Sequence, residues 1–318
     1  MTQEQIDPNA CHQCVRVAKL YYETGLTQHE IAEKLGISRI KVHRILNQAH
    51  ELGIIEVVIH TPQDGHLIDQ EHQLVLRYNL RDALVVPEIL NGETQYHTLA
   101  RGAAAWLEAN LAPGMRIGLG LGRTISHLPL FFNPANQTNC FFTEIVGGSS
   151  ENTGGIAKYN VTSKMAELAD GRAEMMYAPN MVSNRELQRR LISEPAIAEA
   201  LARARKSDII MQSIGTVDET AILLVENRIS QAELQQIQDA GAVGDALGNY
   251  FDQAGKPVAT PLDERVIGLS LTDIQNVSWS VVVAGGKRKH KALRGALLGG
   301  FFNMVITDSE SASYLLND

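Results

Sequence analysis

Apolar positions in the first part of the chain recur with the period of an α-helix and then change to a continuous run. The helical spacing is interrupted at Gly25 and Gly53, which are placed to end helices. The segment 61–65 is rich in Pro, Gly and Asp and predicts a linker. The elements predicted before it are a helix over 14–23, a helix opening at Thr27, a helix opening at Ser38, and a short strand over Ile54–Ile59.

From residue 66 onward, helix-sized segments alternate with short apolar runs. A helix over 67–78 leads to a strand over 83–86. Such alternation predicts the α/β class, a doubly wound and mostly parallel sheet with helices on both faces. We therefore expect two domains, residues 1–61 and residues 62–318. The later predicted strands are 116–119, 141–146, 208–211, 280–283 and 304–307, and the helices between them are 94–110, 160–169, 184–205 and 287–299.

Composition narrows the class of protein. The chain has 318 residues, 44% of them apolar and 20% charged, which excludes wholesale disorder and suits two domains of ordinary size. No apolar run approaches the ~20 residues that cross a bilayer. The first residues lack both the basic and the apolar part of a secretory signal, and three cysteines cannot form a disulfide framework. We expect a cytoplasmic protein with no membrane partner.

The net charge of −8 hides one local contrast. Between residues 38 and 50 the chain carries Arg39, Lys41 and Arg44 and no acidic residue, whereas acids are in excess elsewhere. A short basic face on an acidic body can bind DNA while the rest of the surface is repelled by phosphates. Double-stranded DNA is therefore a candidate partner.

The segment 27–46 has the features of a helix-turn-helix. Thr27 and Glu30 form a capping-box pattern at the start of its first helix. Ala32 is small where two helices cross, and Gly36 supplies the positive φ of the turn. The apolar seam consists of Ile31, Leu35, Ile37, Val42 and Ile45.

The helix that Ser38 caps is expected to be the recognition helix. Its first turn holds Arg39 and Lys41 instead of acids, so its dipole favours an external anion such as DNA phosphate. The alternative is a structural helical hairpin with a solvated basic face. The candidates are Ser38, Arg39, Lys41 and Val42 for base edges, and Gln28, His43 and Arg44 for phosphates, with Thr27 beside them and the 54–59 strand as a wing.

Segments spread over both predicted domains resemble signatures of the SorC family of sugar-binding, DeoR-like bacterial transcriptional regulators. In the first domain these are Leu20–Ala32, Gly36–Arg39 and Gly53–Ile55. The resemblance covers both domains in the family's order, which makes it more specific than any one motif. In the second domain the matching segments are Gly118–Thr124, Gly147–Ser150, Ser213–Gly215, Gly241–Asp252 and Ala284–Lys289.

The resemblance implies a non-enzymatic regulator of a carbohydrate or polyol operon, without cofactor or metal. The first domain would be a winged helix-turn-helix that binds operator DNA. The second would be similar to sugar-phosphate isomerases in fold, and would bind a phosphorylated sugar or polyol that changes operator affinity. A homodimer or homotetramer is implied, and both repression and activation remain open.

The physics of a phosphate site can be argued from the glycines that follow predicted strands. Ligands of parallel α/β sheets bind beyond the carboxyl ends of strands, where glycines let backbone N–H groups approach an anion. Asp245, among glycines, is suited to accept hydrogen bonds from sugar hydroxyls, and Lys287 and Arg288 compete with Lys289 for the phosphate. Arg123 stands where the family varies. The expected effector-binding residues are Gly120, Gly122, Arg123, Thr124, Gly147, Gly148, Ser149, Asp245 and Lys289.

Other functions lack part of their signature. A dinucleotide site over Gly118–Gly122 lacks the third glycine of its motif, because Arg123 stands there. Cys11 and Cys14 have metal-ligand spacing but no second pair. A sugar-phosphate isomerase needs a positioned general base, and Asp245 has no acidic or His partner at a diagnostic spacing. A constitutive DNA-binding protein without effector would have no use for the glycine-rich loops.

Overall fold

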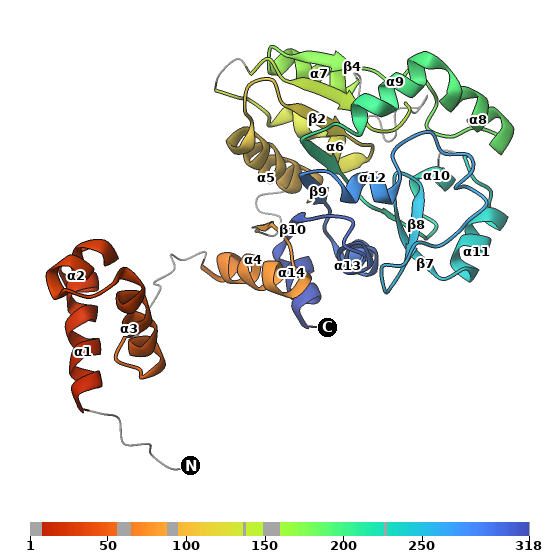
Figure 1. The fold of residues 1–318 in the computed structure, drawn as a ribbon. Coiled ribbons are helices and arrows are strands. Elements are labelled where there is room, and N and C mark those ends of the chain that lie inside the picture. Colours follow the sequence, from red (N-terminus) through yellow and green to blue (C-terminus); the bar gives the residue numbers. More distant parts are fainter. Residues whose placement is uncertain are drawn as a thin grey trace. The chain divides into compact units, whose positions relative to one another are not determined.

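The structure is a computed structural model that describes residues 8–55, 65–87, 95–135, 138–148, 160–225 and 228–317. It divides into two compact units, Met1–Pro62 and Gln63–Asp318. Each unit is described by itself, with the elements labelled in Figure 1.

The smaller unit is built from helices. They are α1 (Pro8–Ala18), which continues into a short π-helical turn, η1 (Lys19–Glu23), then α2 (Gln28–Leu35) and α3 (Arg39–Glu51). The capping box predicted at Thr27 and Glu30 is present at the start of α2, and Gly36 ends this helix with φ 66°. Ser38 caps α3, where its side chain accepts a hydrogen bond from the amide of Lys41.

The predicted apolar seam forms the core of this unit. Ile31, Val42 and Ile45 are buried, and Cys14 packs with them and directs its thiol at the carbonyl oxygen of Ile45. Burial raises the pKa of this thiol, with a smaller contribution from Cys11. Cys14 is therefore a core residue. Of the predicted strand over 54–59, Ile54 and Ile55 lie in no strand, and the rest falls outside the described residues.

The larger unit is built on a seven-stranded, wholly parallel sheet, as the alternation of elements predicts. The strand order is β1-β10-β9-β5-β2-β3-β4, and each neighbouring pair is parallel. The strands are β1 (Asp82–Val86), β2 (Arg116–Leu119), β3 (Phe141–Glu144), β4 (Arg172–Glu174), β5 (Ile209–Gln212), β9 (Trp279–Val283) and β10 (Met304–Asp308).

Helices cover both faces of this sheet, each over its own apolar core. The longer helices are α4 (Gly65–Tyr78), α5 (Gln95–Asn110), α7 (Val161–Leu168), α9 (Pro195–Ala204), α13 (His290–Leu298) and α14 (Ser309–Asn317). One core joins α4, α9, α13 and α14 to one face, and the other joins α5 and α7 to the opposite face. Alternate residues of the buried strands therefore enter different cores, as Val305 and Ile306 of β10 do.

Several features of the larger unit differ from the sequence prediction, among them the exposed edge strand β4, which was not predicted. The single helix expected over 184–205 is two helices, α8 (Arg185–Ser193) and α9, because Pro195 starts a new helix. A second, antiparallel sheet, which the sequence did not predict, joins β6 (Gly215–Thr216), β7 (Ala242–Ala246) and β8 (Asn249–Asp252). This small sheet lies beyond the carboxyl end of β5, and α11 (Gln231–Asp239) leads into β7.

Candidate functional site

The first candidate site is the exposed face of α3. Arg39, Lys41, His43 and Arg44 have exposed side chains, and the first turn of the helix holds no acid. Because the first N–H groups of a helix lack intrahelical acceptors, this end of α3 attracts an anion. The predicted basic face is therefore present on one helix.

Three of the predicted DNA-binding residues have structural tasks. Val42 is 0% exposed and packs in the core, so the expectation that it reads a base edge is wrong. The Thr27 and Ser38 hydroxyls serve as helix caps and accept hydrogen bonds from the amides of Glu30 and Lys41. Gln28 lies half-buried at the start of α2.

Ile40 is the residue that sequence reasoning missed on this face. It is 81% exposed, the second residue of α3, and stands between Arg39 and Lys41. A large aliphatic side chain so exposed in a basic helix N-terminus has no role in the core of its own unit. The signal that could have found it is the apolar seam, which passes through residues 42 and 45 and leaves residue 40 on the outer face.

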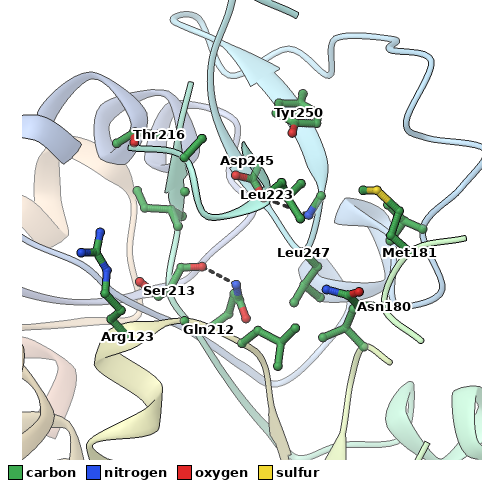
Figure 2. A pocket seen from close by; sticks show the side chains of 18 of the residues that line it. Arg123, Asn180, Met181, Gln212, Ser213, Thr216, Leu223, Asp245, Leu247 and Tyr250 are labelled. Carbon is green, nitrogen blue, oxygen red and sulfur yellow. Dashed lines mark hydrogen bonds between the residues drawn. The ribbon is translucent and has the colours of Figure 1, made fainter. Parts of the chain in front are cut away.

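The second candidate site is a cavity in the larger unit, at the carboxyl ends of β2 and β5 and against the small antiparallel sheet. Its volume, with the open solvent at its mouth included, is about 890 Å³. In Figure 2, Arg123 and Ser213 lie on one side of the space, and Asn180 and Met181 lie on the other. Four of the nine predicted effector residues line this cavity: Gly122, Arg123, Asp245 and Lys289.

Two cationic side chains reach the cavity from different elements. Lys289 ends the short 3₁₀ turn η4 (Lys287–Lys289) after β9, and its Nζ donates to Ser213 Oγ at 2.9 Å. Arg123 begins the short helix α6 (Arg123–Ser126) after β2, and its guanidinium lies 5.0 Å from the ring centre of Tyr96. Burial lowers the pKa of Lys289 to about 8, and the Arg123 guanidinium acts in the same direction. An anion bound here would relieve this repulsion.

Asp245 supplies a carboxylate on the small sheet. Its Oδ2 accepts a hydrogen bond from the amide of Gly248 at 2.9 Å. Burial raises its pKa, while Gly248 and the Lys289 ammonium act in the opposite direction. Gly215 on the paired strand allows this position, because a Cβ there would lie 2.0 Å from Asp245 Oδ1. Burial also raises the pKa of Tyr250, whose ring lines the same wall.

Two amide side chains leave acceptor atoms unpaired at the cavity. Gln212, the last residue of β5, and Asn180 are 4% and 8% exposed. The Oε1 of Gln212 and the Oδ1 of Asn180 are buried and have no hydrogen-bond partner in the described part of the chain. Buried acceptors without a donor are costly, by about 1–3 kcal/mol each. Both residues line the cavity, where a side-chain amide can exchange hydrogen bonds with the hydroxyl groups of a ligand.

The remaining predicted glycines do not form an anion cradle. The amides of Gly120, Gly147 and Gly148 donate to the carbonyl oxygens of Met211, Ile267 and Ala178. Gly147 is required by packing, since a Cβ there would lie 2.4 Å from a backbone carbonyl oxygen. The expected phosphate contacts of these three amides are therefore wrong.

The other predicted effector residues are placed as follows. Gly122 lines the cavity with φ 129°, a conformation that favours glycine. Thr124 is 1% exposed, and its Oγ1 has no partner among the described residues. Ser149 falls outside the described residues. Of the competing cations, Lys287 contacts Glu310, and the cavity lining includes Lys289 alone of residues 287–289.

Several residues that line the cavity were not predicted. Ser213 belongs to a segment that carried the family resemblance, directly after a predicted strand, so its position could have been inferred. Asn180 and Thr216 had no such signal, because they stand in irregular chain or in the small sheet. Among the described residues, no helix is long and apolar enough to cross a membrane, and no cluster of His, Cys, Asp or Glu could hold a metal ion.

Comparison with known proteins identifies the family of this chain. A family model described as a putative sugar-binding domain matches residues 64–317, and a model of region 4 of sigma-70 matches residues 16–51. The transcriptional regulator LsrR of Escherichia coli K12 is 31% identical over 308 residues, which are 96% of this chain and 94% of the relative. The uncharacterized transcriptional regulator YjhU of the same organism is 29% identical over 306 residues, with 93% and 92% covered.

A solved structure shares the fold over almost the whole chain. It is the full-length sorbitol operon regulator SorC from Klebsiella pneumoniae, with a TM-score of 0.73, 22% identity, and coverage of 97% of this chain and 99% of that one. The comparisons confirm the predicted fold class and favour the regulator over the enzyme. The chain belongs to the SorC family of sugar-binding transcriptional regulators and is a DNA-binding regulator.

Proposed function

We propose that the effector of this regulator is a phosphorylated sugar or polyol, bound in the cavity at the carboxyl ends of β2 and β5. The observation that carries this proposal is the presence of two cations, two side-chain amides and a carboxylate in the lining of one cavity. Lys289 and Arg123 are suited to a phosphate group. The side-chain amides of Gln212 and Asn180 are suited to hydroxyl groups.

Asp245 completes the recognition of hydroxyl groups in this proposal. A carboxylate accepts hydrogen bonds from two hydroxyls at once, and although burial raises the pKa of Asp245, the nearby Lys289 ammonium acts in the opposite direction. Leu247, Met181 and Val266 line the same cavity and offer an apolar surface to the carbon skeleton of a sugar. The cavity thus offers different groups to the anionic, the hydroxylated and the apolar parts of one ligand.

On the DNA side, we assign residues 1–61 to operator binding and residues 62–318 to effector binding and self-association. Arg39, Ile40 and Lys41 would enter the major groove, and His43 and Arg44 would contact phosphates. One helix-turn-helix makes few base contacts, so a homodimer or homotetramer on a palindromic operator is expected. The protein would act in the cytoplasm, where such DNA is found.

Regulation follows if the effector favours one arrangement of the subunits over another. A ligand shifts such an equilibrium only by the difference between its affinities for the two arrangements. The effector would then change operator affinity by changing the spacing of the α3 helices within the oligomer. We expect this coupling to require the cations of the cavity and to leave the basic face unchanged.

The test is a melting-temperature screen of pentoses, hexoses and polyols, each with and without a phosphate group. A phosphorylated member is expected to raise the melting temperature, and its unphosphorylated partner to have little effect. The Lys289→Met variant should lose the response. Equal stabilisation by both members of a pair, or an undiminished response of the variant, would contradict the proposal.

A further inference from the structure

A buried carboxylate outside the cavity lies where three elements meet. Asp308 is the last residue of β10 and is 4% exposed. Its Oδ2 accepts hydrogen bonds from the amide of Gly286 and from Gln95 Nε2, both at 2.8 Å, and its Oδ1 accepts one from the amide of Ser311 at 2.8 Å. Asp308 thereby joins the first residue of α5, the start of η4 and the first turn of α14.

The Gly285–Gly286 pair is explained by this carboxylate. A Cβ on Gly285 would lie 2.0 Å from Asp308 Oδ2, and a Cβ on Gly286 would lie 2.4 Å from Gln95 Oε1. Gly286 also has φ 87°, which favours glycine. Because the amide of Gly286 donates to Asp308, the pair serves an anion that belongs to the chain itself and not a ligand.

Both segments that Asp308 holds lead to a cation of the cavity. On one side, the amide of Lys289 donates to the carbonyl oxygen of Gly286 at 2.8 Å, and its Nζ reaches Ser213. On the other side, Gln95 precedes Tyr96, whose ring lies beneath the Arg123 guanidinium. The Asp308 carboxylate thus holds the first residue of each segment, Gly286 before Lys289 and Gln95 before Tyr96, although it does not line the cavity.

We propose that Asp308 is a positioning residue of the effector site, which holds Lys289 and, through Tyr96, Arg123 in the geometry that receives an anionic group. This inference rests on the proposed function of the cavity. A carboxyl group suits this position because three N–H donors converge on its two oxygens. An asparagine would turn an NH₂ group toward one or more of these donors.

The experiment measures the reactivity of the Lys289 amine and needs no effector. Full-length protein is treated with trace acetic anhydride at a series of pH values, and acetylation of Lys289 is followed by mass spectrometry. In Asp308→Asn the segment Gly285–Lys289 is released and the Lys289 ammonium becomes hydrated. The pH at which acetylation of Lys289 is half-maximal, its midpoint, should therefore rise by at least one pH unit. The matched control is Thr307→Val, the adjacent residue, which is 0% exposed and whose Oγ1 has no partner in the described chain.

A second variant guards against misfolding of the first. Gln95→Met keeps the carboxylate and removes one of its donors, and its midpoint should move in the same direction by a smaller amount. An unchanged midpoint in folded Asp308→Asn, or in Gln95→Met when Asp308→Asn does not fold, overturns the inference. So does a shift of the same size in Thr307→Val.

Binding of inorganic phosphate separates this inference from the proposed function. The parent should bind phosphate, and Asp308→Asn should bind it at least tenfold more weakly, while Thr307→Val should match the parent. If the midpoint shifts but the parent does not bind phosphate, the positioning role stands and the anionic effector is contradicted. If the parent binds phosphate and Asp308→Asn binds it equally well, the positioning role is contradicted.

Discussion

Replacing Lys289 by Met should stabilise the protein in the absence of effector while abolishing its response. The structure lowers the pKa of this amine from 10.5 to about 8, chiefly by burial. At 1.36 kcal/mol per pH unit, holding the ammonium in the folded protein costs about 3 kcal/mol near neutral pH. Residual contact with water and the lost hydrogen bond to Ser213 reduce the expected gain to about 1–2 kcal/mol.

The extra stability of Lys289→Met over the parent should disappear as the pH rises. Between pH 8 and 10.5 the unfolded chain holds a proton on Lys289 that the folded protein has released, so the stability of the parent increases with pH in this window. The variant lacks this group and should not gain in this way. The assay is denaturant unfolding of both proteins at pH 7, 8.5 and 10. A stability difference that is independent of pH, or a variant less stable than the parent at pH 7, would refute the reasoning.

Two further predictions concern Ile40, which sequence reasoning missed, and Gly147, to which it assigned a phosphate contact. Ile40→Ala should lose sensitivity to thymine methyl groups. In an operator selected from random DNA, replacing one thymine per half-site by uracil removes a methyl group. This change should lower the operator affinity of the parent about fourfold and leave that of the variant unchanged. A parent that ignores every such replacement removes Ile40 from the interface. Gly147→Ala should lower the free energy of unfolding by about 1–3 kcal/mol, since its Cβ meets a backbone oxygen at 2.4 Å. The control Gly148→Ala, with nothing within 4 Å, should change it little, and equal losses in denaturant unfolding would show that the close contact is not what matters.

The parts of the fold that were predictable depend on local chemistry. The capping box of Thr27 and Glu30 and the positive φ of Gly36 are properties of a few adjacent residues, and the structure confirms them. Six of the seven parallel strands were predicted because their buried positions form short apolar runs, whereas the edge strand β4 is short and mostly exposed and was not predicted. The sheet β6–β8 was missed because its strands are short and contain no run of more than two apolar residues.

The site was only partly predictable because its residues are brought together by tertiary structure. Lys289 and Arg123 were found as cationic residues beside glycines that follow strands, and Asp245 was found as a carboxylate among glycines. No glycine pattern or predicted strand end identifies Asn180. It lines the cavity only because the fold brings it close to residues 212–216 and 245–250, which are distant in the sequence. Glycine itself was the weakest guide: Gly147 and Gly286 are required by close packing and by an internal carboxylate, which the sequence cannot distinguish from a ligand.

The most direct test of the central claim is the affinity of full-length protein for its selected operator, with and without a phosphorylated sugar that raises the melting temperature. We predict a change of about five- to 150-fold in the parent, the usual range of coupling between two sites. Lys289→Met should bind the operator as tightly as the parent and show no change. An operator affinity that stays the same when the ligand saturates the parent would contradict the account.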